Sequence, residues 1–189
     1  INESVEIKRH IHSYAEKTGA DGKYYGECEC GKKAEAAIES TSGTRTYYTA
    51  FVEAAAKVEN GETLTLCSDV NCAADVTMEH KGNSKGHITL NLNGHSLNFA
   101  EGSKLSLLYS YVDVIDDASE NGYISHMYVN WSTTQLYGGS YGQIDAETNM
   151  IKGIRGNGYG YKKIDESVWV TNLDVLSLTD VAVKQAPYT

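Results

Sequence analysis

The chain has 189 residues, of which 41% are hydrophobic and 22% charged. This balance suits a domain with a real core and excludes wholesale disorder. The formal net charge is −9 at pH 7, so an acidic surface repels phosphate backbones and nucleic acid is not an expected partner. No apolar run approaches the ~20 residues that span a bilayer, so we expect no direct membrane insertion. The chain opens at Ile1 without a visible signal peptide, and we expect a piece of a longer protein.

Residues 1–46 are charged, poor in large aliphatic side chains and contain two of the four cysteines. We predict that they form a small Cys/His module, separate from a second domain over residues 47–189. His10, His12, Cys28 and Cys30 supply two imidazoles and two thiolates, which together complete a tetrahedral set for a structural zinc ion. Side chains two residues apart on a strand point the same way, so each pair can reach one ion if the intervening segment forms a hairpin. An exposed histidine pair with free thiols is the alternative that spacing leaves open.

Residues 47–58 fit an amphipathic helix, because small and apolar side chains recur along one stripe. Thr46 or Thr49 can cap its start, and Asn60-Gly61 supplies a left-handed stop. Such a helix suits a lid over the end of a stack of strands, although an ordinary surface helix gives the same pattern. The stripe consists of Ala50, Phe51, Ala54, Ala55 and Val58.

From residue 62 onward, apolar and polar residues alternate in short runs, which is typical of strands, and no helical pattern interleaves them. The class is therefore all-β and not α/β. A β-sandwich gives similar signals to a stack of parallel strands. The predicted strands span residues 62–66, 75–78, 87–92, 104–108, 111–115, 122–129, 134–137, 142–145 and 167–183.

Two segments carry a resemblance to a known fold. Residues 47–66, an alanine-rich stretch followed by Gly-Glu-Thr-Leu-Thr-Leu, resemble the opening of pectin-lyase-like right-handed parallel β-helices. Residues 88–97, read as Ile-Thr-Leu-Asn-Leu-Asn-Gly-His-Ser-Leu, are similar to a rung of β-helix domains in large surface proteins of Gram-positive gut anaerobes, with Asn91 where that pattern usually has aspartate. The resemblance covers residues 47–115, and residues 135–140 fit a further rung. It implies a right-handed parallel β-helix with an N-terminal capping helix.

The N-terminal segment resembles the short His-x-His and Cys-x-x-Cys-Gly spacers that punctuate such surface proteins. Here the cysteine pair, Cys28 and Cys30, is one residue closer than in that pattern. Cys67 and Cys72 flank a turn-like segment, where a disulfide suits an extracellular setting and reduced buried cysteines are the alternative.

Carbohydrate cleavage is the commonest activity of the resembled fold. Asp116 and Asp117 are the best local carboxylate pair for such chemistry, with Asp113 nearby, but adjacent aspartates more often belong to a solvated turn. No complete set of acid, base and metal ligands accompanies them. We therefore expect no catalysis, and these two aspartates are the weak candidates.

Tyrosine, with 14 residues, greatly outnumbers phenylalanine and tryptophan, with two each. Tyrosine combined with glycine gives adaptable recognition surfaces, because the ring offers area at low entropic cost and the hydroxyl finds partners. A long connection between rungs, or a wet strand face, explains the same residues without any ligand. The predicted binding residues are Tyr137, Tyr141, Tyr159, Tyr161 and Trp131.

Together these observations predict a non-catalytic, adhesin-like binding module of a bacterial cell-surface protein. Its expected partner is an extracellular host protein or glycan, namely a host glycoprotein, a mucin glycan or immunoglobulin. One alternative is a polysaccharide lyase or glycosidase of the pectin-lyase-like fold. The other is a structural stalk that holds further domains away from the cell wall.

Overall fold

The computed structural model of the chain describes residues 10–20, 22–79, 86–116, 122–130, 132–146, 159–163 and 169–172. Strands dominate this part of the chain, and the single helix found there, α1, spans Phe51–Ala55. The expected all-β class is confirmed. In the described ranges no helix combines the length and the apolar character that a membrane crossing requires.

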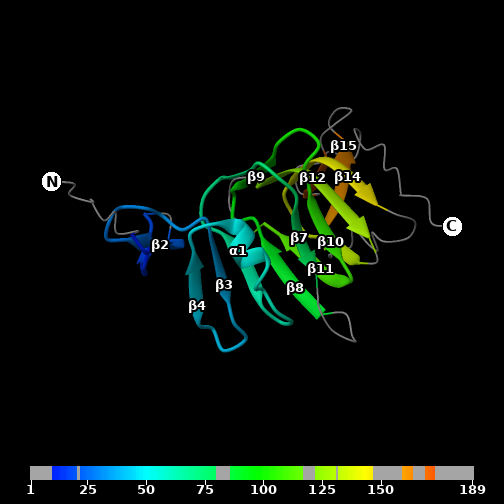
Figure 1. The fold of residues 1–189 in the computed structure, drawn as a ribbon. Helices are drawn as coiled ribbons and strands as arrows, with labels where there is room; N and C mark the ends of the chain where they lie inside the picture. The colour runs from blue at the N-terminus through cyan, green and yellow to red at the C-terminus, as the bar shows by residue number, and fades with distance from the viewer. Residues whose placement is uncertain are drawn as a thin grey trace.

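The strands build three sheets (Figure 1). β1 and β2 form a two-stranded hairpin; β13, β11, β8, β5, β3 and β4 form a six-stranded sheet in that order; and the remaining strands form an eight-stranded sheet. The bounds are β1 Tyr14–Thr18, β2 Tyr24–Cys28, β3 Ala36–Glu39, β4 Arg45–Tyr48, β5 Thr63–Leu66, β6 Val70–Cys72, β7 Val76–Glu79, β8 Gly86–Asn91, β9 Ser96–Phe99, β10 Leu105–Leu108, β11 Ser110–Ile115, β12 Tyr123–Asn130, β13 Thr133–Leu136, β14 Ser140–Ala146, β15 Tyr159–Lys163 and β16 Trp169–Asn172.

Between β5 and β14 every pairing is parallel. The chain leaves the six-stranded sheet after β5, passes through β6 and β7 in the other sheet, and returns as β8 beside β5. The next circuit places β9 beside β6, β10 beside β7 and β11 beside β8. Successive circuits are therefore stacked on one another, and the neighbouring strands of the stack share backbone hydrogen bonds.

The core is a stack of aliphatic side chains inside these circuits. The strand register aligns Leu64 with Leu90, Leu90 with Val114, and Val114 with Leu136. None of these four side chains is more than 1% exposed. Full burial of one such side chain stabilises a fold by about 1.5–3 kcal/mol. The alternation of inward apolar and outward polar residues, seen in the sequence, is what allows this row to form.

The predicted helix over residues 47–58 is wrong in its first third. Tyr47 and Tyr48 belong to β4, which pairs antiparallel with β3, because aromatic residues suit a strand and the ladder supplies partners for their backbone groups. α1 begins after Ala50, which gives no side-chain cap, and neither threonine fills that position. α1 also ends earlier than predicted, at Ala55 with Ala56 as its C-cap, so Gly61, whose φ of +83° is in the left-handed region, belongs to a later turn and does not end the helix.

The strand pairing crosses the domain boundary predicted at residue 46. β3 pairs antiparallel with β5 on one side and with β4 on the other. The six-stranded sheet therefore includes residues from both sides of that boundary, whereas β1 and β2 form a separate two-stranded sheet. The division into two domains itself stays a prediction.

Candidate metal centre

The four predicted metal ligands come together at the open end of the β1–β2 hairpin. The ligand atoms of His10, His12, Cys28 and Cys30 all lie within 4.8 Å of one another. Nε2 of His10 is 3.3 Å from Sγ of Cys28, and Nδ1 of His12 is 3.4 Å from Sγ of Cys30. Around a tetrahedral zinc ion, with Zn–S near 2.3 Å and Zn–N near 2.0–2.1 Å, a nitrogen and a sulfur stand about 3.5 Å apart. The cluster can hold a metal ion without a large rearrangement.

The hairpin creates this proximity. β1 and β2 are antiparallel, with Tyr14 opposite Cys28, so the segment before Tyr14 passes the loop after Cys28. That loop is tight: the N–H of Gly31 donates to the carbonyl of Cys28 at 2.8 Å, and the N–H of Cys28 donates to the carbonyl of Lys32 at 2.9 Å. Gly31 has a φ of +82°, which only glycine adopts at little cost. The hairpin that the His/Cys spacing required is confirmed.

The cluster favours the thiolate form of Cys28. The backbone N–H of Cys30, followed by the imidazoles of His10 and His12, lowers the pKa of the Cys28 thiol to about 5. The thiolate is the form that ligates metals. Cys28 is buried while Cys30 and His10 are exposed, so an ion can reach the cluster from solvent.

The arrangement is suited to holding the hairpin and not to chemistry on a substrate. Four protein ligands fill a tetrahedral shell and leave no position for an activated water. The ring of Tyr14 stacks on that of His12 at 6.0 Å between centroids. The Tyr14 hydroxyl in turn donates to Oγ1 of Thr49 at 2.9 Å, just after β4. This chain of contacts connects the cluster to the six-stranded sheet.

The other two cysteines stand apart from the cluster. All four cysteines are free in the structure. Cys67 is buried, and burial raises its pKa to about 12. Burial also raises the pKa of Cys72, which lies in β6. Both thiols therefore stay protonated at neutral pH and are poor metal ligands.

Asp116 performs a structural task. Its Oδ1 accepts the N–H of Gly94 at 2.8 Å, and its Oδ2 accepts the N–H of Gly122. Both carboxylate oxygens are therefore engaged by the backbone of neighbouring turns. Asp113 pairs with His87 across 2.8 Å. Asp117 lies outside the described residues, so the geometry of the predicted carboxylate pair is not defined.

Two of the predicted binding tyrosines have described side chains, and they differ. Tyr141 is 0% exposed and donates its hydroxyl to the carbonyl of Gly138 at 2.7 Å. Its ring belongs to the core, so its assignment to a recognition surface is corrected. Tyr137 is half-buried on the outward side of the chain after β13, where its hydroxyl donates to Oε1 of Gln135. Of the other three, Trp131 lies outside the described residues and the side chains of Tyr159 and Tyr161 do as well.

Sequence reasoning missed three exposed tyrosines. Tyr24, Tyr109 and Tyr111 are 49%, 49% and 44% exposed. The signal for Tyr111 was present in the sequence, because Val112 and Val114 face inward and therefore direct Tyr111 outward. Tyr109 carried no such signal, since it lies in the short connection between β10 and β11.

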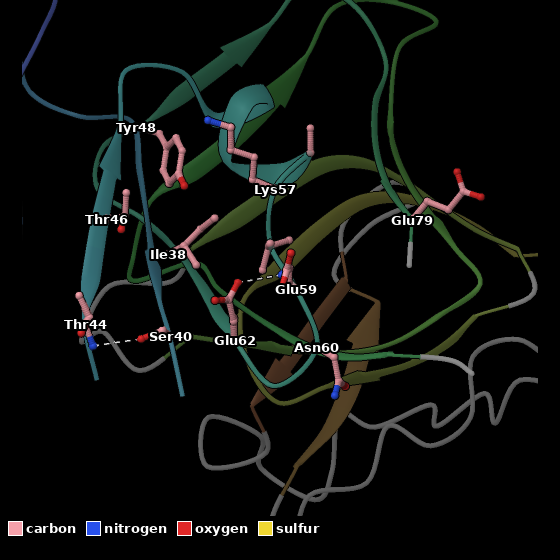
Figure 2. Close-up of a pocket in the computed structure, with 12 residues that line it drawn as sticks. Ile38, Ser40, Thr44, Thr46, Tyr48, Lys57, Glu59, Asn60, Glu62 and Glu79 are labelled. Carbon is pink, nitrogen blue, oxygen red and sulfur yellow. Dashed lines mark hydrogen bonds between the residues drawn. The ribbon is translucent and has the colours of Figure 1, made fainter. Parts of the chain in front are cut away.

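Two cavities lie on opposite sides of the β3–β4 hairpin. The end cavity, of about 850 Å³, is lined by Ile38 and Tyr48 on that hairpin and by the segment after α1 (Figure 2). Two of its charged side chains make local contacts: the Lys57 ammonium lies 5.0 Å from the Tyr48 ring centre, and Glu62 accepts the N–H of Glu59 at 2.8 Å.

The hairpin cavity, of about 310 Å³, lies between the β1–β2 hairpin and the outward side of the six-stranded sheet. Its walls include Lys23 and Tyr24 from the hairpin and Arg45 and Tyr47 from β4. Cys67 and Asn93, which are both buried, also line it. Nothing in the sequence analysis pointed to either cavity, because each is formed by segments that are distant along the chain.

No family model matches the chain, and comparisons with curated proteins and with solved structures found no match either. The resemblance of residues 47–115 to β-helix domains therefore stays a prediction.

Proposed function

We propose that the chain is a non-catalytic binding module of a bacterial cell-surface protein, and that the outer face of its six-stranded sheet is the binding surface. The observation that carries this proposal is the row of outward side chains His87, Tyr111 and Thr133, which the register places side by side on three adjacent strands. Tyr111 is 44% exposed. Tyr137 lies at the end of β13 on the same face. Exposed tyrosines on a rigid sheet give contact area at little entropic cost.

The fold behind this surface is, in our proposal, a right-handed parallel β-helix with α1 as its N-terminal cap. Parallel strands stacked in register support it, as do side-chain hydrogen bonds that link positions 22 to 29 residues apart. A periodic stack of this kind presents a long, continuous face to a partner. The resemblance to surface proteins of Gram-positive gut anaerobes agrees with an extracellular location.

The ion in the hairpin is zinc in this proposal. Two imidazoles with two thiolates at tetrahedral spacing are a donor set that zinc favours over oxygen-seeking cations such as calcium and magnesium. A closed site in so short a hairpin supplies folding energy that its few apolar residues cannot. The zinc role is structural: it keeps the hairpin in one conformation against the sheet.

The partner is a host protein or glycan: a mucin glycan, another host glycoprotein or immunoglobulin. Tyrosine faces stack on sugar rings and also pack against protein loops, so the surface chemistry suits each of these. The structural carboxylate of Asp116 supports a role without catalysis, because both of its oxygens already bind backbone N–H groups.

Binding to immobilised mucin and to immunoglobulin, measured by biolayer interferometry, tests the proposal. We expect the double variant Tyr111→Ala with Tyr137→Ala to lose at least tenfold in affinity. Tyr128→Ala removes a half-buried tyrosine from the other sheet and is the matched control, expected to bind as the unaltered protein does. Absence of binding to both probes, together with tandem copies of this domain in the full protein, contradicts the proposal and favours the stalk.

Metal analysis of protein purified without a histidine tag tests the zinc. We expect one zinc per chain, lost in the Cys28→Ser with Cys30→Ser variant. Cobalt substitution gives a second readout, because tetrahedral Co²⁺ with thiolate ligands absorbs visible light far more strongly than octahedral Co²⁺ does. A metal content near zero with four freely titratable thiols removes the zinc proposal.

A further inference from the structure

We infer that the hairpin cavity binds one unit of a neutral sugar. This inference rests on the proposed function, since it names the ligand class for the end of the same outer face that lies next to the β1–β2 hairpin. The cavity volume of about 310 Å³ is at the lower end of the ~300–1,000 Å³ typical of small-molecule sites. It therefore accommodates a single sugar ring and part of a neighbouring one.

The floor of the cavity is a row of four residues on adjacent strands. The register places Tyr47 opposite Ala37, Ala37 opposite Thr65, and Thr65 opposite Asn91. Neighbouring strands are about 4.8 Å apart, so the row extends across the sheet in even steps. Ala37 is the smallest side chain in the row and lies between the ring of Tyr47 and the hydroxyl of Thr65. The hollow exists because this position carries only a methyl group.

Three polar groups that line the cavity, on Asn91, Thr63 and Thr65, are available to a ligand. Oδ1 of Asn91 accepts the N–H of Asn93 at 2.9 Å, whereas its amide nitrogen has no hydrogen-bond partner among the residues that the structure describes. The side-chain hydroxyls of Thr63 and Thr65 also have none in that part of the chain, and both residues are half-buried in the cavity. A hydroxyl both donates and accepts, so these groups can bind ligand hydroxyls in either sense.

The charged groups of the cavity are already paired within the protein. Nε of Arg45 donates to Glu39 at 2.6 Å, and its Nη1 lies 3.4 Å from Glu16. The ammonium of Lys23 donates to the carbonyl of Asn93 at 2.9 Å. A charged ligand gains its main attraction only by competing with these contacts. A neutral ligand leaves them intact.

An aromatic ring stands at the rim. Tyr24 is 49% exposed, and the guanidinium of Arg45 lies 4.4 Å from the centre of its ring. The cation keeps the ring in place while half of its surface stays open to solvent. The exposed part of the ring offers apolar area to the C–H groups of a sugar, beside floor groups that bind its hydroxyls.

The main alternative for a neutral polar ligand is an extended peptide. A peptide that adds to a sheet needs an unpaired strand edge. The floor strands β3, β5 and β8 each pair with a strand on both sides, and β4, which lines the cavity with Arg45 and Tyr47, is the edge strand of the sheet. The floor itself presents side chains, and a ligand rich in hydroxyls matches them better than a chain of amides.

The test measures binding of three sugars of similar shape and different charge to the full chain, by ligand-observed NMR and calorimetry. N-acetylglucosamine is the neutral probe, glucosamine the cation and glucuronic acid the anion; galactose and N-acetylgalactosamine extend the neutral set. We expect at least one neutral sugar to bind at millimolar affinity or better. We expect glucosamine and glucuronic acid each to bind at least fivefold more weakly than N-acetylglucosamine.

Two variants localise the binding. Ala37→Leu fills the hollow, and Thr65→Val removes one hydroxyl with little change in shape; we expect at least a tenfold and at least a threefold loss of affinity, respectively. Thr77→Val makes the same change at an exposed position of β7 in the other sheet and serves as the matched control. Circular dichroism and thermal unfolding of each variant show whether the fold is kept, and Thr65→Val keeps the test decisive if Ala37→Leu does not fold.

The outcomes separate this inference from the proposed function. Mucin or immunoglobulin binding that depends on Tyr111 and is unaffected by Thr65→Val leaves the proposed function standing and overturns the sugar site. Sugar binding that Thr65→Val weakens, with no affinity for any host protein or glycan polymer, supports the site and contradicts the adhesin role. Tighter binding of glucosamine or glucuronic acid than of N-acetylglucosamine overturns the assignment to a neutral ligand.

Discussion

Oδ1 of Asp69 accepts a hydrogen bond from the backbone N–H of Ser96, 27 residues further along the chain, at 2.8 Å. The same relationship recurs where Asn60 accepts from His87 and where Asp75 accepts from Lys104. In each case a side chain shortly before a strand of one circuit satisfies a backbone donor at or near the start of a strand in the next circuit. Turns are where the strand ladder cannot supply partners, so these side chains complete the hydrogen bonding of the stack.

Asp116 is the most engaged of these turn acceptors, because it receives N–H groups from both Gly94 and Gly122. We expect Asp116→Ala to lower the free energy of unfolding by about 2–4 kcal/mol, since hydrogen bonds to charged groups contribute about 1.5–3 kcal/mol each. Asp116→Asn keeps one acceptor oxygen and is expected to lose less. Urea unfolding measures both, with Asp75→Ala as the exposed, single-bond control. Equal losses for Asp75→Ala and Asp116→Ala argue against this role.

The thiol of Cys28 gives the hairpin a defined pH dependence. Its pKa falls to about 5 in the folded protein, against an ordinary value near 9, because the backbone N–H of Cys30 and then His10 and His12 stabilise the thiolate. A group whose pKa is lowered by folding stabilises the fold fully above the unfolded pKa, and this contribution is lost as pH falls through the folded pKa. We therefore expect metal-free hairpin stability to decline between about pH 9 and pH 5.

Thiolate absorbance of the metal-free protein, followed over this range, measures the titration of Cys28. Cys67 contributes no thiolate absorbance in this pH range, because burial raises its pKa to about 12. A thiolate signal that appears only above pH 8 contradicts the predicted stabilisation. The comparison with Cys28→Ser assigns the signal to one residue.

Metal removal is expected to loosen the hairpin and spare the stacked strands. After treatment with a chelator, backbone amides of β1 and β2 should exchange faster with deuterium, while those of β8 and β11 stay protected by their parallel neighbours on both sides. Hydrogen-exchange mass spectrometry resolves the two regions. Cys72→Ser, which alters a thiol outside the cluster, should keep the metal. Simultaneous loss of protection in β8 and β11 shows that the metal supports the whole fold.

The hairpin rests on the sheet through a close contact between Gly26 and Tyr47. A Cβ atom at position 26 stands only 2.5 Å from Cγ of the Tyr47 ring, so Gly26→Ala requires the ring or the hairpin to move. We expect a loss of about 1–3 kcal/mol, as for other overpacked contacts. The cost should shrink in a Tyr47→Ala background, where the space is free, and a double-mutant cycle measures this coupling. Additive effects contradict the contact.

Tyr109 holds its backbone in the left-handed region, with a φ of +52°. A side chain other than glycine pays roughly 1–2 kcal/mol for this conformation, and asparagine pays less than tyrosine. The ring of Tyr109 is half exposed, so its removal forfeits little packing. We expect Tyr109→Asn to raise the free energy of unfolding by about 0.5–1 kcal/mol, while Tyr111→Asn, in the regular strand β11, gives no gain. Thermal unfolding of both variants distinguishes the outcomes.

Strand alternation was readable from the chain itself. Most inward positions of β5, β8 and β11 are apolar and most outward positions polar, with Ser110 and Ile115 at the ends of β11 as exceptions, and this pattern lies within a few consecutive residues. Local periodicity of that kind predicts both the strands and their inward faces, because side chains alternate across any strand. The donor types of the metal cluster were equally evident from residue identity and spacing.

The start of α1 and the burial of Tyr141 were decided by contacts between residues that are far apart in the sequence. Tyr47 and Tyr48 directly precede an apolar stripe that suits a helix. They nevertheless form part of β4, because β3 pairs with them through backbone hydrogen bonds. Tyr141 lies in a Gly/Tyr-rich segment typical of exposed loops, yet its neighbours in the stack cover it completely. Burial depends on what packs against a residue, and the local sequence does not contain that information.

The amino-acid sequence alone therefore determined the β class, the face of each strand that points inward and the residue types available for metal binding, since each depends on neighbouring residues. Tertiary structure alone decided that Tyr14 lies opposite Cys28, which brings the four ligands within reach of one ion. It also decided that Ala37, Thr65 and Asn91 form one floor beneath the hairpin. The physical reason is that strand register joins residues far apart in the chain through backbone hydrogen bonds whose partners no local pattern specifies.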